Sequence, residues 1–336
     1  MKNRESGIDL LRCIGLLFVV GVHSFLNNGF YSEPQTGVLM WGANSFRWLF
    51  FCCNGIFMML TGYLKSTKPW DRKYYRSLVP ILISYLLTCV LSFPIRHFLL
   101  GEKLTMLQWL DKMVTFANYG WYVEMYIGLF LLSPLVNLAL EHMTEPKQLL
   151  LAAGTLAGLT ALPSITALNI IPDYWTSLYP VTYYVIGAVI RRLQPKLPRW
   201  ICFGGVALLA MGLGFATLIT SPKYFNDGFG QGYGGFWTTI MVTLLFLGLY
   251  QVRVERKAGK ILAWMAGGCF EGYILSRLLD VWVYALLPQW HTPEKYPLLF
   301  VCVTIPIFIL SLLAGKGVNS LTGLLMKQSA KTPVTK

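Results

Sequence analysis

Long apolar stretches recur along the chain, and short connections between them hold most of the polar residues. A helix needs about 20 apolar residues to cross a membrane core of about 30 Å. Ten stretches reach or approach this length: residues 8–26, 43–64, 77–99, 120–140, 148–167, 177–191, 200–220, 234–251, 260–286 and 297–315. We therefore predict an all-α, polytopic membrane protein with about ten transmembrane helices.

The basic residues fall mainly on one side of this topology. Of the 28 Lys and Arg residues, 20 lie before the first span, after the last span or in every second connection, and 5 lie in the other connections. Cytoplasmic loops carry such an excess of Lys and Arg. The sequence thus predicts that both termini are cytoplasmic and that the chain is a multi-pass protein of the cell's inner, cytoplasmic membrane.

The overall composition agrees with an embedded chain and narrows the classes of partner. The sequence is 55% hydrophobic and 13% charged, with a net charge of +13, whereas soluble proteins average about 25% charged residues. These values exclude a disordered chain, an ordinary soluble enzyme and a nucleic-acid-binding domain. Because most of the positive charge follows the topology, the expected partner of the basic surface is the lipid bilayer rather than nucleic acid.

The first predicted span contains the polar residues Asp9, Arg12 and His23. Arg12 and His23 are 11 residues apart, so on a helix they share one face and lie about 16 Å apart along its axis. In the predicted orientation, Arg12 lies near the cytoplasmic surface and His23 near the outer surface. Asp9 precedes Arg12 by three residues and is a candidate ion-pair partner. Such a stripe must face protein or water rather than lipid.

The two ends of this stripe suit different chemistry. An arginine guanidinium binds phosphate or carboxylate groups through a rigid fork of donors. A histidine titrates near neutral pH and can act as a general base. An internal ion pair that only locks helices together is the structural alternative for each buried charge.

Further charged residues gather toward the outer side of the predicted spans. Arg47 and Glu124 lie in the second and fourth spans, and Glu271 lies in the ninth without a local partner. Arg277 and Asp280 are three residues apart, so a local ion pair is the expected arrangement. An outer cavity lined by His23, Arg47, Glu124 and Glu271 is suited to a polar acceptor such as a sugar.

Several motifs resemble those of the acyltransferase-3 superfamily of integral-membrane acyltransferases. The first is the Arg12–His23 pair on a span that begins Ile8-Asp9-Leu10-Leu11-Arg12. The others are the run ending in Thr61-Gly62-Tyr63-Leu64, the basic connection with Lys73 and Arg76, Trp121-Tyr122 followed by Leu129, Leu132 and Pro134, and the run Cys269-Phe270-Glu271-Gly272-Tyr273-Ile274-Leu275. Ser276 departs from this pattern, because many members carry a second histidine there.

The resemblance implies an enzyme that moves an acyl group, most often acetyl, from cytoplasmic acyl-coenzyme A to a hydroxyl of an extracytoplasmic or lipid-linked surface glycan in bacteria. It implies a membrane acyltransferase domain over residues 1–316, followed by a short basic cytoplasmic tail, 317–336. The implied site roles are donor binding by Arg12, Lys73 and Arg76, catalysis by His23, Glu124 and Asp9, and acceptor binding by Arg47, Trp121, Tyr126 and Glu271. No metal is expected.

Within these roles, Asp9 is expected to orient Arg12 and Glu124 to orient His23. His23 would remove the proton of the acceptor hydroxyl or carry the acyl group transiently. Two other functions stay open at this stage. A transporter or exporter of a small solute or glycan precursor is compatible with ten spans, although no internal repeat is visible. The other alternative is a sensory or scaffold protein, but such a protein does not require charged residues in costly positions inside the membrane.

Overall fold

The computed structural model describes residues 5–115, 120–165, 170–225, 232–287 and 292–329, and within these ranges it contains helices and no strands. The α-helices are α1 (Ser6–Asn27), α2 (Gly37–Phe50), α3 (Cys53–Lys65), α4 (Arg72–Arg76), α5 (Val79–Pro94), α6 (Met106–Val114), α7 (Trp121–Glu141), α8 (Pro146–Ala161), α9 (Tyr179–Leu193), α10 (Arg199–Thr220), α11 (Phe236–Leu249), α12 (Arg256–Ala266), α13 (Cys269–Ala285), α14 (Tyr296–Leu299) and α15 (Ile305–Ser329). The predicted all-α class is confirmed.

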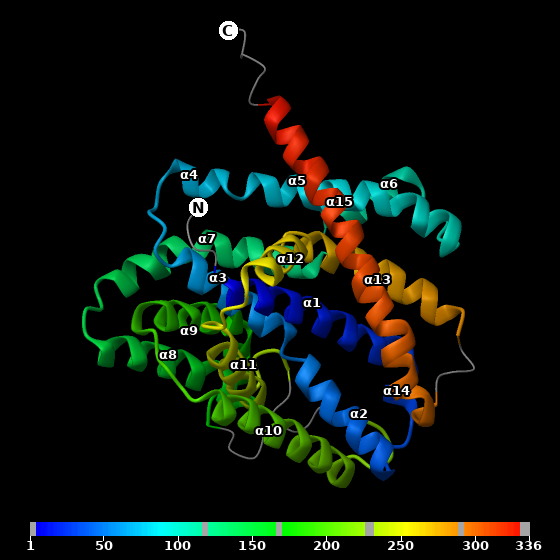
Figure 1. Cartoon of the computed structure of the whole chain (residues 1–336), viewed down its shortest axis with the longest axis horizontal. Coiled ribbons are helices and arrows are strands. Elements are labelled where there is room, and N and C mark those ends of the chain that lie inside the picture. Colours follow the sequence, from blue (N-terminus) through cyan, green and yellow to red (C-terminus); the bar gives the residue numbers. More distant parts are fainter. Residues whose placement is uncertain (1–4, 116–119, 166–169, 226–231, 288–291, 330–336) are drawn as a thin grey trace.

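Helix α1 forms the centre of the bundle. It packs against α2, α3, α12 and α13, and also contacts α11 and α15. Figure 1 shows it crossing the middle of the molecule, with α5 on one side and α10 on the other. A helix that is apolar around most of its circumference is favoured in such a buried position. The polar stripe of α1 is therefore held inside protein.

Helices α3 and α9 approach each other closely because each has a glycine at the contact. A Cβ atom on Gly62 would collide with the Tyr184 carbonyl oxygen, and one on Gly187 would collide with the Met59 carbonyl oxygen. Small residues allow helix backbones to approach in this way inside membranes. This contact fixes α3, which carries part of the wall of the site described below.

Six helical runs are long and apolar enough to cross a membrane, among the described residues. They are Ser6–Asn27, Gly37–Lys65, Arg72–Leu99, Trp121–Glu141, Arg199–Thr220 and Pro293–Lys327. Helices also occupy the remaining predicted ranges, but α8, α9 and α11 have 16, 15 and 14 residues. The count of ten spans and the cytoplasmic position of the termini stay predictions.

Two predicted spans differ from the structure because each contains a break. The range 43–64 is divided between α2 and α3 at Phe51 and Cys52, and the range 260–286 is divided between α12 and α13 at Gly267 and Gly268. Gly268 lies against the backbone of α15, where a Cβ would come within 2.8 Å of the Leu312 carbonyl oxygen. An apolar stretch by itself does not reveal such breaks, and the one at Gly268 coincides with a close contact between helices.

The predicted boundary between residues 316 and 317 falls inside a helix. Helix α15 runs from Ile305 to Ser329 without interruption, whereas the sequence suggested a separate basic tail. Residues 330–336 of that tail lie outside the described residues. The last turns of α15 border a cavity of about 620 Å³, which is described below.

Candidate functional site

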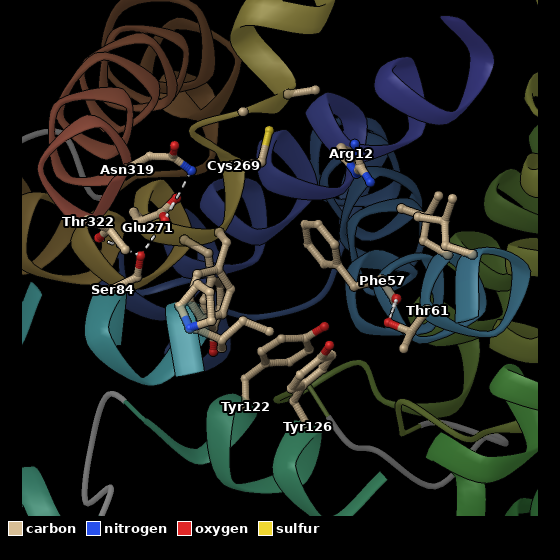
Figure 2. Close-up of a pocket in the computed structure, with 18 of the residues that line it drawn as sticks. Arg12, Phe57, Thr61, Ser84, Tyr122, Tyr126, Cys269, Glu271, Asn319 and Thr322 are labelled. Atoms are coloured by element: carbon tan, nitrogen blue, oxygen red, sulfur yellow. Dashed lines mark hydrogen bonds between the residues drawn. The ribbon is translucent and has the colours of Figure 1, made fainter. Parts of the chain in front are cut away.

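Two cavities lie along α1, one at the level of Arg12 and one at the level of His23. The first, here called the inner cavity, has a volume of about 620 Å³. Figure 2 shows Arg12 on one side of this cavity and a group of polar side chains around Glu271 on the other. Its wall is completed by Phe57, Leu60, Thr61, Leu64, Lys65, Pro80, Ile81, Ser84, Tyr122, Tyr126, Ala266, Gly267, Cys269, Phe270, Tyr273, Asn319, Thr322, Gly323 and Met326.

The second cavity, here called the outer cavity, contains His23. Its volume is about 200 Å³, and it is lined by Val19, Val22, His23, Leu26, Cys53, Asn54, Trp121, Tyr233, Tyr273 and Arg277. Because Arg12 and His23 share a face of α1, the two cavities follow one another along that helix. The sequence correctly linked these two side chains through their spacing, and the structure gives each of them its own cavity.

The guanidinium of Arg12 is held by a local ion pair. Arg12 Nη1 donates a hydrogen bond to Asp9 Oδ1 at 3.0 Å. The Asp9 side chain is 3% exposed, whereas that of Arg12 is 32% exposed. The expected contact between these residues is therefore present, with the carboxylate inside protein and the guanidinium at the cavity wall. Such a charge-assisted bond fixes the orientation of the planar guanidinium.

A second cation borders the inner cavity. Sequence reasoning included it only as the start of the basic connection 65–76 and did not name it as a donor-binding residue. Lys65, at the end of α3, lines this cavity, and its Nζ lies 4.8 Å from the centroid of the Phe130 ring. The expected donor-binding residues Lys73 and Arg76 are exposed on α4 and are not among the lining residues. The only sequence signal for Lys65 was its position as the first basic residue after an apolar span.

His23 is oriented by an aspartate from a distant part of the chain. His23 Nδ1 and Asp280 Oδ2 are 2.9 Å apart, with side chains 16% and 0% exposed. The sequence had assigned the orienting role to Glu124, but Glu124 is exposed on α7. That assignment is corrected here. The bond at Nδ1 directs Nε2, the other ring nitrogen, away from Asp280, as in a catalytic base held by a carboxylate.

The expected local pair between Arg277 and Asp280 is also replaced by contacts between helices. Arg277 lines the outer cavity, and its Nη1 donates a hydrogen bond to Asn27 Oδ1 at 3.4 Å. Asp280 faces His23 instead. Helices α1 and α13 are thus joined at two places near the outer cavity, through His23 and through Asn27.

Glu271 lies in the inner cavity rather than beside His23, which corrects its expected place in an outer cavity. Its Oε1 accepts hydrogen bonds from Ser84 Oγ at 2.8 Å and from Asn319 Nδ2 at 3.3 Å. Figure 2 shows both bonds, with Thr322 next to Ser84. Glu271 is 3% exposed, and its Oε2 has no hydrogen-bond partner among the described residues. A buried carboxylate oxygen in this state is suited to a ligand N–H or O–H group.

The other predicted acceptor residues occupy three different places. Trp121 lines the outer cavity and stacks on Tyr233, with ring centroids 5.6 Å apart. Tyr126 lines the inner cavity. Arg47 is 2% exposed and packs on aromatic rings, with its guanidinium carbon 4.4 Å from the centroid of Phe51. Arg47 is absent from the walls of both cavities, so the expected outer cavity that includes it is not formed.

Two further features bear on the chemistry of the site. Ser276 is fully buried, and its Oγ donates to the Tyr273 carbonyl oxygen at 2.8 Å. Among the described residues, no three His, Cys, Asp or Glu side chains form a group that could hold a metal ion. The polar groups of the two cavities are His23 with its partner Asp280, the cations Arg12, Lys65 and Arg277, the Glu271 carboxylate, and hydroxyl and amide groups.

Comparison with known proteins identifies one family. A family model described as an acyltransferase domain, Acyl_transf_3, matches residues 5–316, which is nearly the whole chain. No curated protein and no solved structure gives a significant match. The match contains both Arg12 and His23, and it ends before the turns of α15 that border the inner cavity.

Proposed function

Because the chain belongs to the acyltransferase-3 family, we propose that it transfers an acyl group from acyl-coenzyme A to a hydroxyl of a surface glycan. The observation that carries this proposal is the pair of cavities on one face of α1, with Arg12 in the first and His23 in the second. The donor enters the inner cavity from the cytoplasm, and the acceptor enters the outer cavity from the opposite side. The acyl group is acetyl, and the membrane is the inner membrane of a bacterial cell.

The inner cavity has the chemistry that an acyl-coenzyme A donor requires. Arg12 and Lys65 provide positive charge for its phosphate groups. Most of the remaining wall is apolar, and the Glu271 group can accept a hydrogen bond from an amide N–H of the pantetheine arm. Arg12 and His23 lie about 16 Å apart along α1, a distance comparable to an extended pantetheine arm. The thioester therefore arrives next to the outer cavity.

The outer cavity has the chemistry that a hydroxyl acceptor requires. The His23–Asp280 pair removes the proton of the acceptor hydroxyl as its oxygen attacks the thioester carbonyl. When the carbon–sulfur bond breaks, the same proton moves from His23 to the departing thiolate sulfur of coenzyme A and gives the free thiol. The stacked rings of Trp121 and Tyr233 provide an apolar face for a sugar ring. The family match gives no support to the transporter alternative.

The proposal is tested by acyl transfer with purified protein in detergent or nanodiscs. Labelled acetyl-coenzyme A and a cell-surface glycan fraction serve as donor and acceptor. The wild type is expected to release coenzyme A and to label the glycan, and His23→Ala is expected to lose both activities. His142→Ala is the matched control, because His142 is an exposed histidine at the end of α7. Equal activity of the His23→Ala variant and the wild type would reject the catalytic role, and absence of transfer by the wild type would reject the function.

A further inference from the structure

Tyr273 is the residue at which the two cavities meet. Among the described residues, it alone borders both the inner and the outer cavity. It belongs to α13, and it precedes Asp280 on that helix by seven residues. Residues seven apart share a helix face, here about 10 Å apart along the axis. Tyr273 and Asp280 are thus presented by the same face of α13.

The ring of Tyr273 packs against that of Tyr122 where the inner and outer cavities adjoin. The two rings meet edge to face, with centroids 5.0 Å apart, and Tyr122 lines the inner cavity. Tyr122 in turn packs edge to face against Phe57, at 6.0 Å. Figure 2 shows Phe57 and Tyr122 directed into the inner cavity. A thioester that extends from Arg12 toward His23 reaches this pair of rings, here called the aromatic septum of Tyr122 and Tyr273.

The hydroxyl of Tyr273 is available to a ligand. Tyr273 is 7% exposed, and no hydrogen bond joins its hydroxyl to another described residue. Tyr284, on the same helix, shows the usual arrangement, since its hydroxyl lies 3.0 Å from Thr304 Oγ1. A hydroxyl that no described residue engages and that borders two cavities can donate a hydrogen bond to an oxygen of the substrate.

We propose that the Tyr273 hydroxyl donates a hydrogen bond to the thioester carbonyl oxygen during acyl transfer. This inference rests on the proposed function. As the acceptor oxygen bonds to the carbonyl carbon, the carbonyl electron pair moves onto oxygen and the acceptor proton moves to His23. Tyr273 keeps its own proton and stabilises the negative oxygen. Re-forming the carbonyl expels the sulfur, which takes the proton from His23. Donors placed at the developing oxyanion are among the largest contributions to catalysis.

The test is the variant Tyr273→Phe, which removes the hydroxyl and keeps the ring of the septum. We expect kcat to fall by about 100-fold or more, the effect of losing one oxyanion donor. We expect the KM for acetyl-coenzyme A to change by less than about twofold, because the lost bond acts in the transition state. The matched control is Tyr284→Phe, which removes a hydroxyl from the same helix and should leave kcat unchanged.

The outcomes separate this inference from the proposed function. If the wild type transfers no acyl group, the proposed function fails and Tyr273 has no reaction to assist. If the wild type is active and Tyr273→Phe keeps its kcat, the oxyanion role is wrong. If Tyr273→Phe raises KM in proportion to its loss of activity with kcat unchanged, the hydroxyl binds the ground state, and the oxyanion role is again rejected. A loss confined to kcat in a folded variant supports the proposal.

Discussion

The contact between His23 and Asp280 gives the sharpest single prediction. Asp280→Asn keeps the shape of the side chain and removes its charge. The 2.9 Å bond between His23 Nδ1 and Asp280 Oδ2 is buried, and a hydrogen bond to a charged group contributes about 1.5–3 kcal/mol. If the bond contributes this free energy only when His23 is protonated in the transition state, its loss lowers kcat by about 10- to 150-fold. The conversion uses about 1.36 kcal/mol for each factor of ten in rate.

A change of histidine tautomer increases the expected loss. The asparagine amide can donate to Nδ1, which leaves the proton on Nε2 and blocks the nitrogen that should act as base. In a Ser–His–Asp triad the same substitution costs about 10⁴-fold in kcat for this reason. We therefore expect Asp280→Asn to lower kcat by more than about 10-fold and by less than about 10⁴-fold.

The assay is transfer of the labelled acetyl group from acetyl-coenzyme A to the glycan at saturating donor and acceptor, which gives kcat. Asp173→Asn, at an exposed aspartate, is the control for the chemical change. Thermal unfolding in the same detergent checks that the variant is folded. A folded Asp280→Asn protein with wild-type kcat would refute the reasoning, because it would mean that the buried carboxylate does not act on the chemistry at His23.

Three further predictions address binding and packing. Arg12→Ala should raise the KM for acetyl-coenzyme A by about tenfold or more, because it removes a hydrogen bond to a charged group. The KM for acetyl-pantetheine, which has no phosphates, should change little. Glu271→Gln should weaken donor binding, measured by titration calorimetry, because it removes a buried charge beside the proposed path of the arm; Glu141→Gln, at an exposed site, should not. Gly62→Ala should lower the free energy of unfolding by about 1–3 kcal/mol through overpacking, whereas Gly128→Ala, with open space at its Cβ, should not.

Each of these predictions has a contrary result. An equal effect of Arg12→Ala on both donors would place its role away from the phosphates. Unchanged donor affinity in Glu271→Gln would remove Glu271 from the donor cavity's function. Equal thermal stability of the two glycine variants would mean that α3 and α9 separate easily, contrary to the close backbone contact described above.

Local sequence patterns were sufficient to predict where helices lie within the ten expected spans and which polar residues share a face of α1. The spacing of Arg12 and His23 fixes their common face because both lie on one helix, and the Asp9–Arg12 pair follows from the same geometry. The apolar stretches predicted the positions of helices at every expected span. They did not reveal the breaks between α2 and α3 or between α12 and α13, of which the second coincides with a close contact between helices.

Contacts between distant residues were beyond sequence reasoning. Asp280 lies 257 residues after His23, and its spacing from Arg277 suggested a different, local partner. Glu124 was predicted to orient His23 because it lies in an apolar predicted span, but its side chain is exposed on α7. Glu271 was assigned to the wrong end of the site because its depth depends on how α13 lies beside α1. Only the tertiary fold supplies these relationships.

The aromatic septum also bears on the electrical state of the membrane. A protein that opened a water-filled path between the two cavities would let protons flow down their gradient at each turnover. Tyr122 and Tyr273 pack edge to face where the inner and outer cavities adjoin, so aromatic rings border the place where such a path would run. In the proposed reaction the acyl group moves outward at this point and the acceptor proton moves inward, while the rest of coenzyme A and the glycan stay on their own sides. Under this proposal, the cell modifies its exterior with a cytoplasmic metabolite without an open water path through the protein.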